Sequence, residues 1–191
     1  MRRAIVLIVL TVFVIGLLTG AYIVVTGVSA RPQPSTLEMR TAHAMRSIAI
    51  RARLRGGGNP VPASADVVEE GMEHFADHCA VCHGNDGSGN TEMGRGLYPR
   101  APDMRLDATQ KLSDAELFYI IENGVRLTGM PGWSTGTKEG ETSSWHLVHF
   151  IRHLPTLTGD EVARMEQLNP KSPQQVRQEI EEEKFLQGGP Q

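Results

Sequence analysis

The 191 residues are enough for one domain with appendages, and their charge is unevenly distributed along the chain. Residues 1–30 carry +2 and residues 31–65 carry +5, so the net charge of −3 leaves −10 on the rest. This acidic part argues against nucleic acid as a partner, because binding phosphate needs Lys and Arg. The two cysteines, Cys79 and Cys82, are too few for a disulfide framework or for a zinc finger with two Cys pairs.

An uncharged stretch over residues 4–25 follows Arg2 and Arg3. As a helix it would be about 33 Å long, which suffices to cross a hydrocarbon core of about 30 Å. The alternative is a cleaved signal peptide with Val28-Ser29-Ala30 as its cleavage site. Because signal cores usually have only about 7–15 apolar residues, we expect a retained transmembrane anchor.

Residues 31–65 form a basic segment, which we interpret as a linker or amphipathic arm. Leu37, Met45 and Ile48 can share one face of a helix, with the arginines elsewhere on its surface. Two interpretations stay open for this helix. It either rests on lipid headgroups as a basic amphipathic helix or forms a solvated linker.

Three helices are expected in the next ninety residues, separated by a long loop rich in Gly and Pro. The second begins with the capping box Ser113-Asp-Ala-Glu116 and ends at Gly124, which can take the left-handed conformation. The third ends before Pro155. The expected helices cover residues 65–77, 113–123 and 143–154, and the loop covers residues 85–107.

The last part of the chain, residues 157–191, is expected to be a polar helical tail. Thr158-Gly-Asp-Glu161 is a second capping box, followed by apolar residues at helical spacing. Ser172-Pro173 starts a further helix that should end near Gly188. Alternating apolar residues, the mark of a sheet, are absent from the sequence, so we expect an all-α protein.

The motif Cys79-Ala-Val-Cys82-His83 has the spacing that attaches a c-type haem. Two thiols bond to the vinyl groups on one edge of the porphyrin, and the adjacent imidazole ligates the iron from below. A redox dithiol would normally lie beside a βαβ pattern, which the sequence lacks. The motif therefore predicts one covalent haem c, held by Cys79, Cys82 and His83.

The second axial position on the iron needs another ligand, and Met130 is the best candidate. It lies in a loop between Gly129 and Pro131, outside any periodic apolar segment, whereas core methionines usually occupy such segments. Met93 and Met104, on the loop nearer the haem motif, are weaker candidates.

Several histidines could in principle bind a further metal. His146, His149 and His153 lie on one side of the third expected helix, and His74 and His78 are four residues apart on the first. Because no Cys or clear carboxylate joins them, we expect surface histidines and no second metal site.

Three elements in fixed order resemble the small class I cytochromes c. They are Gly71-x3-Phe75-x3-Cys79-x2-Cys82-His83-Gly84, then Met130-Pro131-x-Trp133, then the helix from Trp145 to Leu154. The resemblance covers about residues 66–156. It implies a class I cytochrome c fold, to which the N-terminal transmembrane helix and the C-terminal helical extension are added.

The resemblance also implies the ligand set and one supporting contact. His83 and Met130 would be the axial ligands, and a proline carbonyl would accept a hydrogen bond from the proximal histidine. Pro102 is the best match for that proline, with Pro99 second. Few lysines occur in the haem domain, so a lysine-rich docking face for partners is not expected.

These observations predict an electron carrier that is not itself an enzyme and has no small-molecule substrate. It would pass single electrons between redox proteins, as a tethered carrier or as a subunit of a larger oxidoreductase complex, because a haem with both axial positions filled has no open site. The alternative is a haem enzyme or gas-binding cytochrome with a displaceable sixth ligand. The arginines after the span outnumber those before it, and this bias favours a domain in the cytoplasm. Haem attachment instead requires the domain on the periplasmic or other extracytoplasmic side of the cell membrane, which is the orientation we expect.

Overall fold

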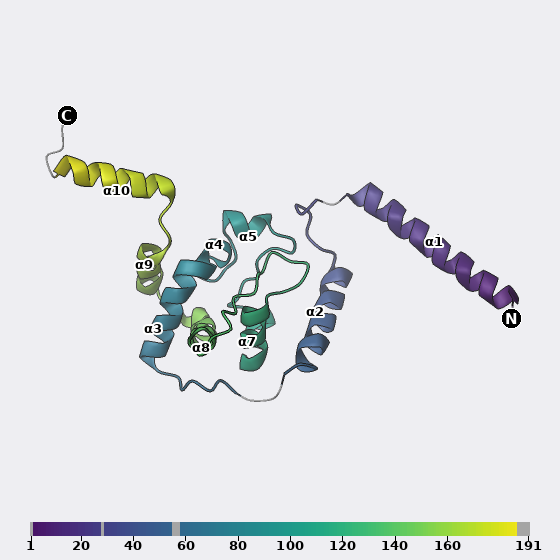
Figure 1. Ribbon diagram of the computed structural model, residues 1–191, viewed down its shortest axis with the longest axis horizontal. Coiled ribbons are helices and arrows are strands. Elements are labelled where there is room, and N and C mark those ends of the chain that lie inside the picture. The colour runs from purple at the N-terminus through teal and green to yellow at the C-terminus, as the bar shows by residue number, and fades with distance from the viewer. Residues whose placement is uncertain (1, 28, 55–57, 187–191) are drawn as a thin grey trace. The chain divides into compact units, whose positions relative to one another are not determined.

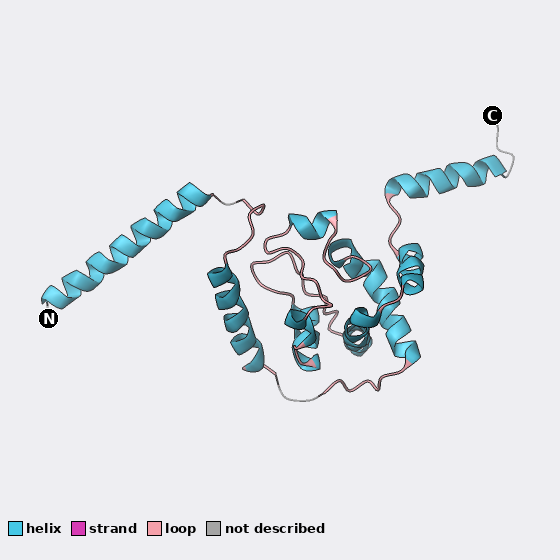
Figure 2. Ribbon diagram, turned by 180° about the vertical axis from the view of Figure 1, so that it is seen from behind, coloured by secondary structure: helices cyan, strands magenta, loops and turns pink. Residues whose placement is uncertain are grey.

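The computed structural model describes residues 2–27, 29–54 and 58–186, and the chain divides into two units, Met1–Pro32 and Gln33–Gln191. Within the described residues every regular element is a helix, as Figures 1 and 2 show. This confirms the all-α expectation. The predicted helix end near Gly188 lies outside the described residues, as does Val28 of the alternative cleavage site.

The first unit is dominated by helix α1 (Arg2–Thr26). Its segment Arg2–Val25 is long and apolar enough to cross a membrane, and its large apolar side chains are exposed. A soluble unit this small could not leave such a surface in water without a large free-energy cost. The predicted span at residues 4–25 falls inside this helix.

The core of the second unit lies where α3 (Ala65–His74) crosses α8 (Lys138–His153). The two helices approach so closely at Gly71 that an added Cβ atom would collide with the His146 carbonyl. Just beyond the crossing, the rings of Phe75 and Phe150 lie 5.1 Å apart. Both rings are fully buried, together with Met72, Leu147, Val148, Leu154 and Met165.

Helix α7 (Asp114–Asn123) packs against α8 and has both ends that the sequence predicts. The Ser113 hydroxyl accepts from the Glu116 amide, and the Glu116 carboxylate accepts from the Ser113 amide. Gly124 ends the helix with a φ of 66°. Arg152 of α8 fixes the segment before α7 by donating to Asp114 and to the Gln110 and Leu112 carbonyls.

Some boundaries differ from expectation for local reasons. The loop at residues 85–107 contains the short helix α5 (Glu92–Gly96), which Thr91 caps, and α6 (Asp107–Gln110) follows it. Helix α8 begins at Lys138, earlier than expected, because the Thr137 hydroxyl accepts from the Gly140 amide and caps it. A single 3₁₀ turn, Leu154–Thr156, then closes α8.

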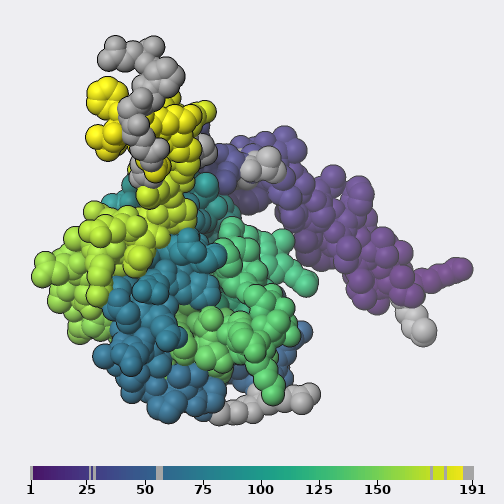
Figure 3. Space-filling model, turned by 60° about the vertical axis from the view of Figure 1, so that its left-hand side comes forward, coloured from purple at the N-terminus to yellow at the C-terminus, as the bar shows by residue number. Residues whose placement is uncertain are grey.

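Two helices follow this turn. In α9 (Gly159–Leu168), Met165 is fully buried and Arg164 pairs with Glu69 of α3 at 2.5 Å. Figure 3 shows the yellow-green α9 lying directly against the blue α3, in agreement with Figure 1. Helix α10 (Pro173–Leu186) exposes its apolar residues, including Phe185. The first helix of the predicted tail therefore packs on the core.

Candidate haem site

Cys79, Cys82 and His83 lie on a continuous run of helix that changes its winding at the motif. After α3, residues Phe75–Cys79 form a π-helical turn, and α4 (Ala80–His83) completes the run. Single π-turns inside α-helices occur often at functional sites. The turn is closed where the Ala80 amide donates to the Phe75 carbonyl, so the motif starts on a distorted rather than a regular helix.

The two thiols are partly buried and unpaired, and no disulfide joins them. Burial, together with a smaller effect of the neighbouring Cys82, raises the pKa of Cys79 to about 12. Burial also raises the pKa of Cys82. Raised pKa values favour neutral thiols over the reactive thiolate of a redox dithiol. This argues against the redox dithiol reading.

His83 is buried, with only 9% of its surface exposed, and its ring lies 6.4 Å from that of Phe75. Burial lowers its pKa, and the Pro102 backbone acts in the opposite direction. Burial therefore favours the neutral imidazole, which is the form that ligates metals. Among the described residues, His83 Nδ1 is the one buried side-chain nitrogen or oxygen without a hydrogen-bond partner.

The proximal side of the motif is built from the loop that follows it. The Gly89 amide donates to the His83 carbonyl at 2.7 Å, and the Thr91 hydroxyl donates to the Val81 carbonyl at 2.8 Å. Pro102, the predicted second-sphere residue, has its backbone against the His83 ring, close to the orphaned Nδ1 but outside good hydrogen-bond geometry. Pro99 has no such interaction with His83 among those described.

The three candidate methionines have different environments. Met104 is buried in the core, and its amide donates to the Gly87 carbonyl, so it is a packing residue. Met93 is 54% exposed on α5. Met130 is partly buried on the loop after α7. It is therefore the candidate that combines a loop position with a partly accessible side chain, as an iron ligand requires.

The Met130 loop is anchored at its base. The Val125 amide donates to the Met130 carbonyl at 3.1 Å, and the Trp133 amide donates to the Ile121 carbonyl at 3.0 Å. At Gly124 an added Cβ atom would collide with the Met130 carbonyl, so this position needs glycine for space as well as for its φ. Gly129 packs against Leu97, which brings this loop to the segment after α5.

The histidines outside the motif form contacts between elements. His146 pairs with Glu70 at 2.8 Å, His149 Nε2 lies 2.8 Å from the Val61 carbonyl, and His153 pairs with Glu161 at 2.8 Å. All three are partly buried, so the expectation of surface histidines was wrong for them, whereas His78 is exposed as expected. Across the described residues, no three His, Cys, Asp or Glu side chains gather to hold a metal ion.

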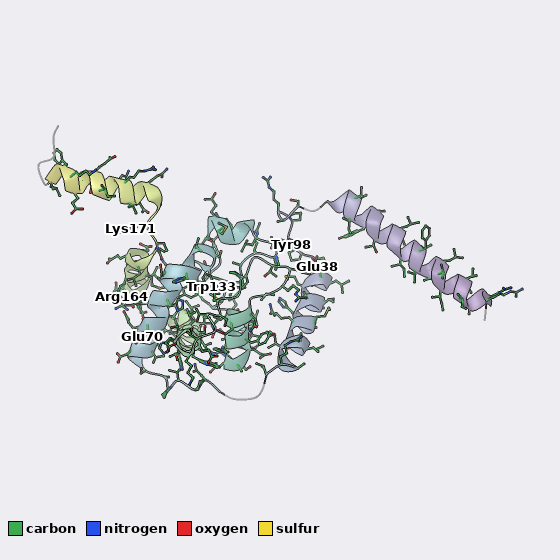
Figure 4. The ribbon with its side chains drawn as sticks, in the orientation of Figure 1. Glu38, Glu70, Tyr98, Trp133, Arg164 and Lys171 are labelled. Carbon is green, nitrogen blue, oxygen red and sulfur yellow. The ribbon has the colours of Figure 1, made fainter. Side chains whose placement is uncertain are left out.

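Aromatic rings line the approach to the motif. His78 lies edge-on to Trp133, with ring centroids 5.6 Å apart, and also to His74 at 4.9 Å. Figure 4 shows Trp133 beside the helical run that carries the motif. The Trp133 ring therefore connects the Met130 loop to the helix that carries the haem motif.

The residues fit a covalently bound haem. Two neutral thiols at the required spacing flank a buried, neutral imidazole whose Nδ1 still lacks its partner, and an apolar core surrounds them. Met130, on the loop anchored to α7, would supply a soft thioether, which suits iron as a ligand. Residues with this chemistry define a c-type cytochrome domain.

Comparison with known proteins agrees with this class. A family model described as "Cytochrome C oxidase, cbb3-type, subunit III" matches residues 66–151, and the cofactor of such c-type domains is haem c. The chain is 37% identical over 94 residues to "Cbb3-type cytochrome c oxidase subunit FixP" of Rhizobium meliloti (strain 1021). It is 38% identical over 73 residues to the FixP subunit of Sinorhizobium medicae (strain WSM419), and 33% over 94 residues to FixPc of Rhizobium leguminosarum bv. viciae.

The segment matched to the Sinorhizobium medicae protein is 38% of this chain and 23% of that protein. The segments matched to the Rhizobium meliloti and Rhizobium leguminosarum proteins are each 49% of this chain, and they are 29% and 30% of those proteins. The likeness thus belongs to the haem domain, which is a c-type cytochrome domain. The chain spans less than a third of the length of these relatives.

Proposed function

We propose that this chain is a membrane-tethered cytochrome c with one haem, which passes single electrons between redox proteins. The observation that carries the proposal is the orphaned, buried His83 imidazole beside the only two cysteines of the chain. Two thiols attach one porphyrin, so the cysteine count supports a single haem. The domain boundaries proposed from the sequence, residues 66–156, enclose this site.

Each residue of the site has a proposed role. Cys79 and Cys82 would hold the porphyrin through their sulfur atoms, and His83 and Met130 would ligate its iron. Pro102 accepts a hydrogen bond from Nδ1 of His83, which would fix the ring and tune its basicity. When bound, the haem supplies an iron that gains and loses one electron. With His83 and Met130 both bound to the iron, no position on it would remain open to a substrate.

The chain is further proposed to be a subunit of a cbb3-type oxidase or of a similar oxidoreductase. Its relatives carry the printed name of cbb3-type oxidase subunits, and the family model names subunit III. The acidic charge of the haem domain would suit a partner with a basic docking face. The domain would lie on the extracytoplasmic side, where c-type haem is attached.

Purification of the native membrane complex with a mild detergent tests this proposal. The expected result is a haem-staining band of this chain that co-purifies with a catalytic oxidase subunit, at one haem per chain by alkaline pyridine spectroscopy. A chain that purifies alone and carries no covalent haem would contradict it. Carbon monoxide binding to the reduced, isolated chain would favour the gas-binding alternative.

A further inference from the structure

Helix α2 (Thr36–Arg51) has two surfaces with different roles. Its inner surface packs on the haem domain, where Ile50 is only 5% exposed and α2 contacts α7. At the C-terminal end, Arg51 Nε lies 3.3 Å from Glu116 Oε1. At the N-terminal end, the Tyr98 hydroxyl donates to Glu38 at 2.6 Å, and Figure 4 shows these two side chains next to each other. Both ends of α2 are therefore fixed to the domain.

The outer surface of α2 carries an apolar stripe with no cover among the described residues. Leu37, Met45 and Ile48 are 76%, 66% and 70% exposed. At about 100° per residue they fall within an arc of roughly 80°, on the side of the helix opposite Ile50. A helix that is held by one face and exposes large apolar side chains on the other has a second surface to bury.

The charge around the stripe indicates which kind of surface would cover it. Residues 31–65 carry +5 while the rest of the second unit is strongly acidic, so α2 is a basic layer on an acidic domain. Arg40 borders the stripe and is exposed. On the other side of the stripe, Glu38 accepts a hydrogen bond from Tyr98. An apolar stripe bordered by an arginine, on a basic segment, matches the boundary between acyl chains and anionic headgroups, where such a helix lies in the plane of the membrane.

The chain keeps α2 within reach of that boundary if α1 is the anchor. Nine residues separate Thr26 from Thr36, and fully extended they span at most about 30 Å. A tether of this length holds the stripe near the headgroups, so its weak membrane affinity acts at a high local concentration.

We propose that the Leu37–Met45–Ile48 face of α2 lies in the anionic lipid interface and holds the haem domain in one orientation against the membrane. This inference rests on the proposed anchor at α1. Arg51 and Glu38 fix α2 to the domain. Burial of the stripe in the lipid interface would therefore fix the orientation of the whole domain relative to the membrane. The face of the domain opposite α2 is then directed away from lipid, toward redox partners.

Photocrosslinking in the full-length protein tests this orientation. The photoreactive residue p-benzoylphenylalanine replaces Met45, and matched variants carry it at Val14 in α1 or at Leu106, an exposed apolar residue elsewhere on the domain. The haem-loaded protein is reconstituted in nanodiscs containing phosphatidylglycerol and irradiated, and lipid adducts are measured by mass spectrometry. The expected yields are high at Val14 and Met45 and at least fivefold lower at Leu106.

Other outcomes separate the inference from the anchor. Adducts at Val14 but not at Met45 would overturn the α2 interface while the anchor stands. Equal adducts at Met45 and Leu106 would overturn a fixed orientation, and crosslinks from Met45 to a second copy of the chain would assign the stripe to a protein partner. No lipid adduct at any position would overturn both the anchor and the inference. In discs of phosphatidylcholine alone, the Met45 yield should fall several-fold while the Val14 yield stays unchanged.

Discussion

Three properties of the His83 side chain bear on its role in the CxxCH motif. It is buried, its pKa is lowered by that burial, and Nδ1 faces the Pro102 backbone without a completed hydrogen bond. A buried, unpaired nitrogen costs roughly 1–3 kcal/mol, so such an atom needs a partner or a ligand that orients the ring. The unpartnered Nδ1 thus supports the predicted contact with Pro102, and the burial of the ring supports the ligand role.

Covalent attachment can be tested at the two thiols. Cys79→Ser or Cys82→Ser should leave one bond and weaken retention of haem, whereas the double change should abolish it, because each thiol bonds one vinyl group. Haem staining after denaturing electrophoresis measures this. Val81→Ala, an exposed position inside the same motif, is the matched control and should keep the wild-type signal. Haem that survives denaturation in the double variant would disprove covalent attachment at these residues.

The sixth ligand can be tested at Met130. Met130→Ala should open an axial position, and the reduced protein should then bind carbon monoxide, whereas Met130→His should keep the iron low-spin and lower its potential, since a thioether favours ferrous iron. The far-red charge-transfer band of Met ligation should disappear in both. Met93→Ala, on an exposed side chain, should change neither the spectrum nor the potential. An unchanged spectrum in Met130→Ala would remove this residue from the site.

At the scale of elements, the sequence predicts well wherever local chemistry decides the outcome. The capping box at Ser113 and Glu116 and the stop at Gly124 were confirmed, because hydroxyl, carboxylate and φ requirements act within a few residues. The π-turn before Ala80 was not predicted, since a change of winding follows from packing of the whole α3–α8 crossing. The same holds for the docking of α2.

A second pattern in the sequence of α2 indicates this docking, in addition to the exposed apolar stripe of the helix. Met39, Arg46 and Ile50 repeat at spacings of seven and four residues, on the face opposite Leu37 and Ile48. A helix with two such faces contacts two surfaces. Arg46 of the inner face interacts electrostatically with Glu116, which Arg51 also contacts, and the sequence analysis assigned Glu116 to capping alone. Long-range ion pairs of this kind cannot be read from local spacing.

The attachment of α9 predicts a pH dependence of stability. Burial raises the pKa of Glu161, but the Thr158 amide and hydroxyl and His153 outweigh it and lower the pKa to about 2, from an unfolded value near 4.5. A depressed carboxyl pKa stabilises the fold above pH 4.5, and this contribution is lost as the pH falls from 4.5 through 2. Its size is about 1–3 kcal/mol.

Glu161→Gln should therefore lower the free energy of unfolding at pH 7 and reduce its decrease between pH 5 and pH 2. Denaturant titrations of the haem-loaded protein at several pH values measure both effects. Glu166→Gln, an exposed position on the same helix, is the control and should follow the wild-type curve. Equal pH dependence in wild type and Glu161→Gln would show that the contact with His153 and Thr158 adds no stability.

At the scale of the whole molecule, charge divides the chain into three successive zones. An apolar helix bounded by two arginines comes first, a basic segment of +5 follows, and an acidic domain of −10 comes last. An acidic domain is repelled by an anionic bilayer, and the basic segment between them reduces that repulsion. The order of the zones along the chain therefore agrees with a domain that is held close to a membrane but faces outward from it.

This order leads to a prediction for topology. The full-length protein should sediment with membranes and resist extraction by carbonate, because α1 spans the bilayer, and its domain should be digested by protease added to spheroplasts. The arginines of the basic segment instead predict a domain in the cytoplasm. The experiment therefore distinguishes a topology set by flanking arginines from one set by the compartment in which haem is attached. A C-terminal tag with immunoblotting reports accessibility, and a cytoplasmic protein followed in the same samples is the control for intact cells.

Soluble protein that starts near Arg31 would mean that α1 is a cleaved signal. A tag protected from protease until the cells are lysed would place the domain in the cytoplasm and remove the basis for covalent haem attachment at Cys79 and Cys82.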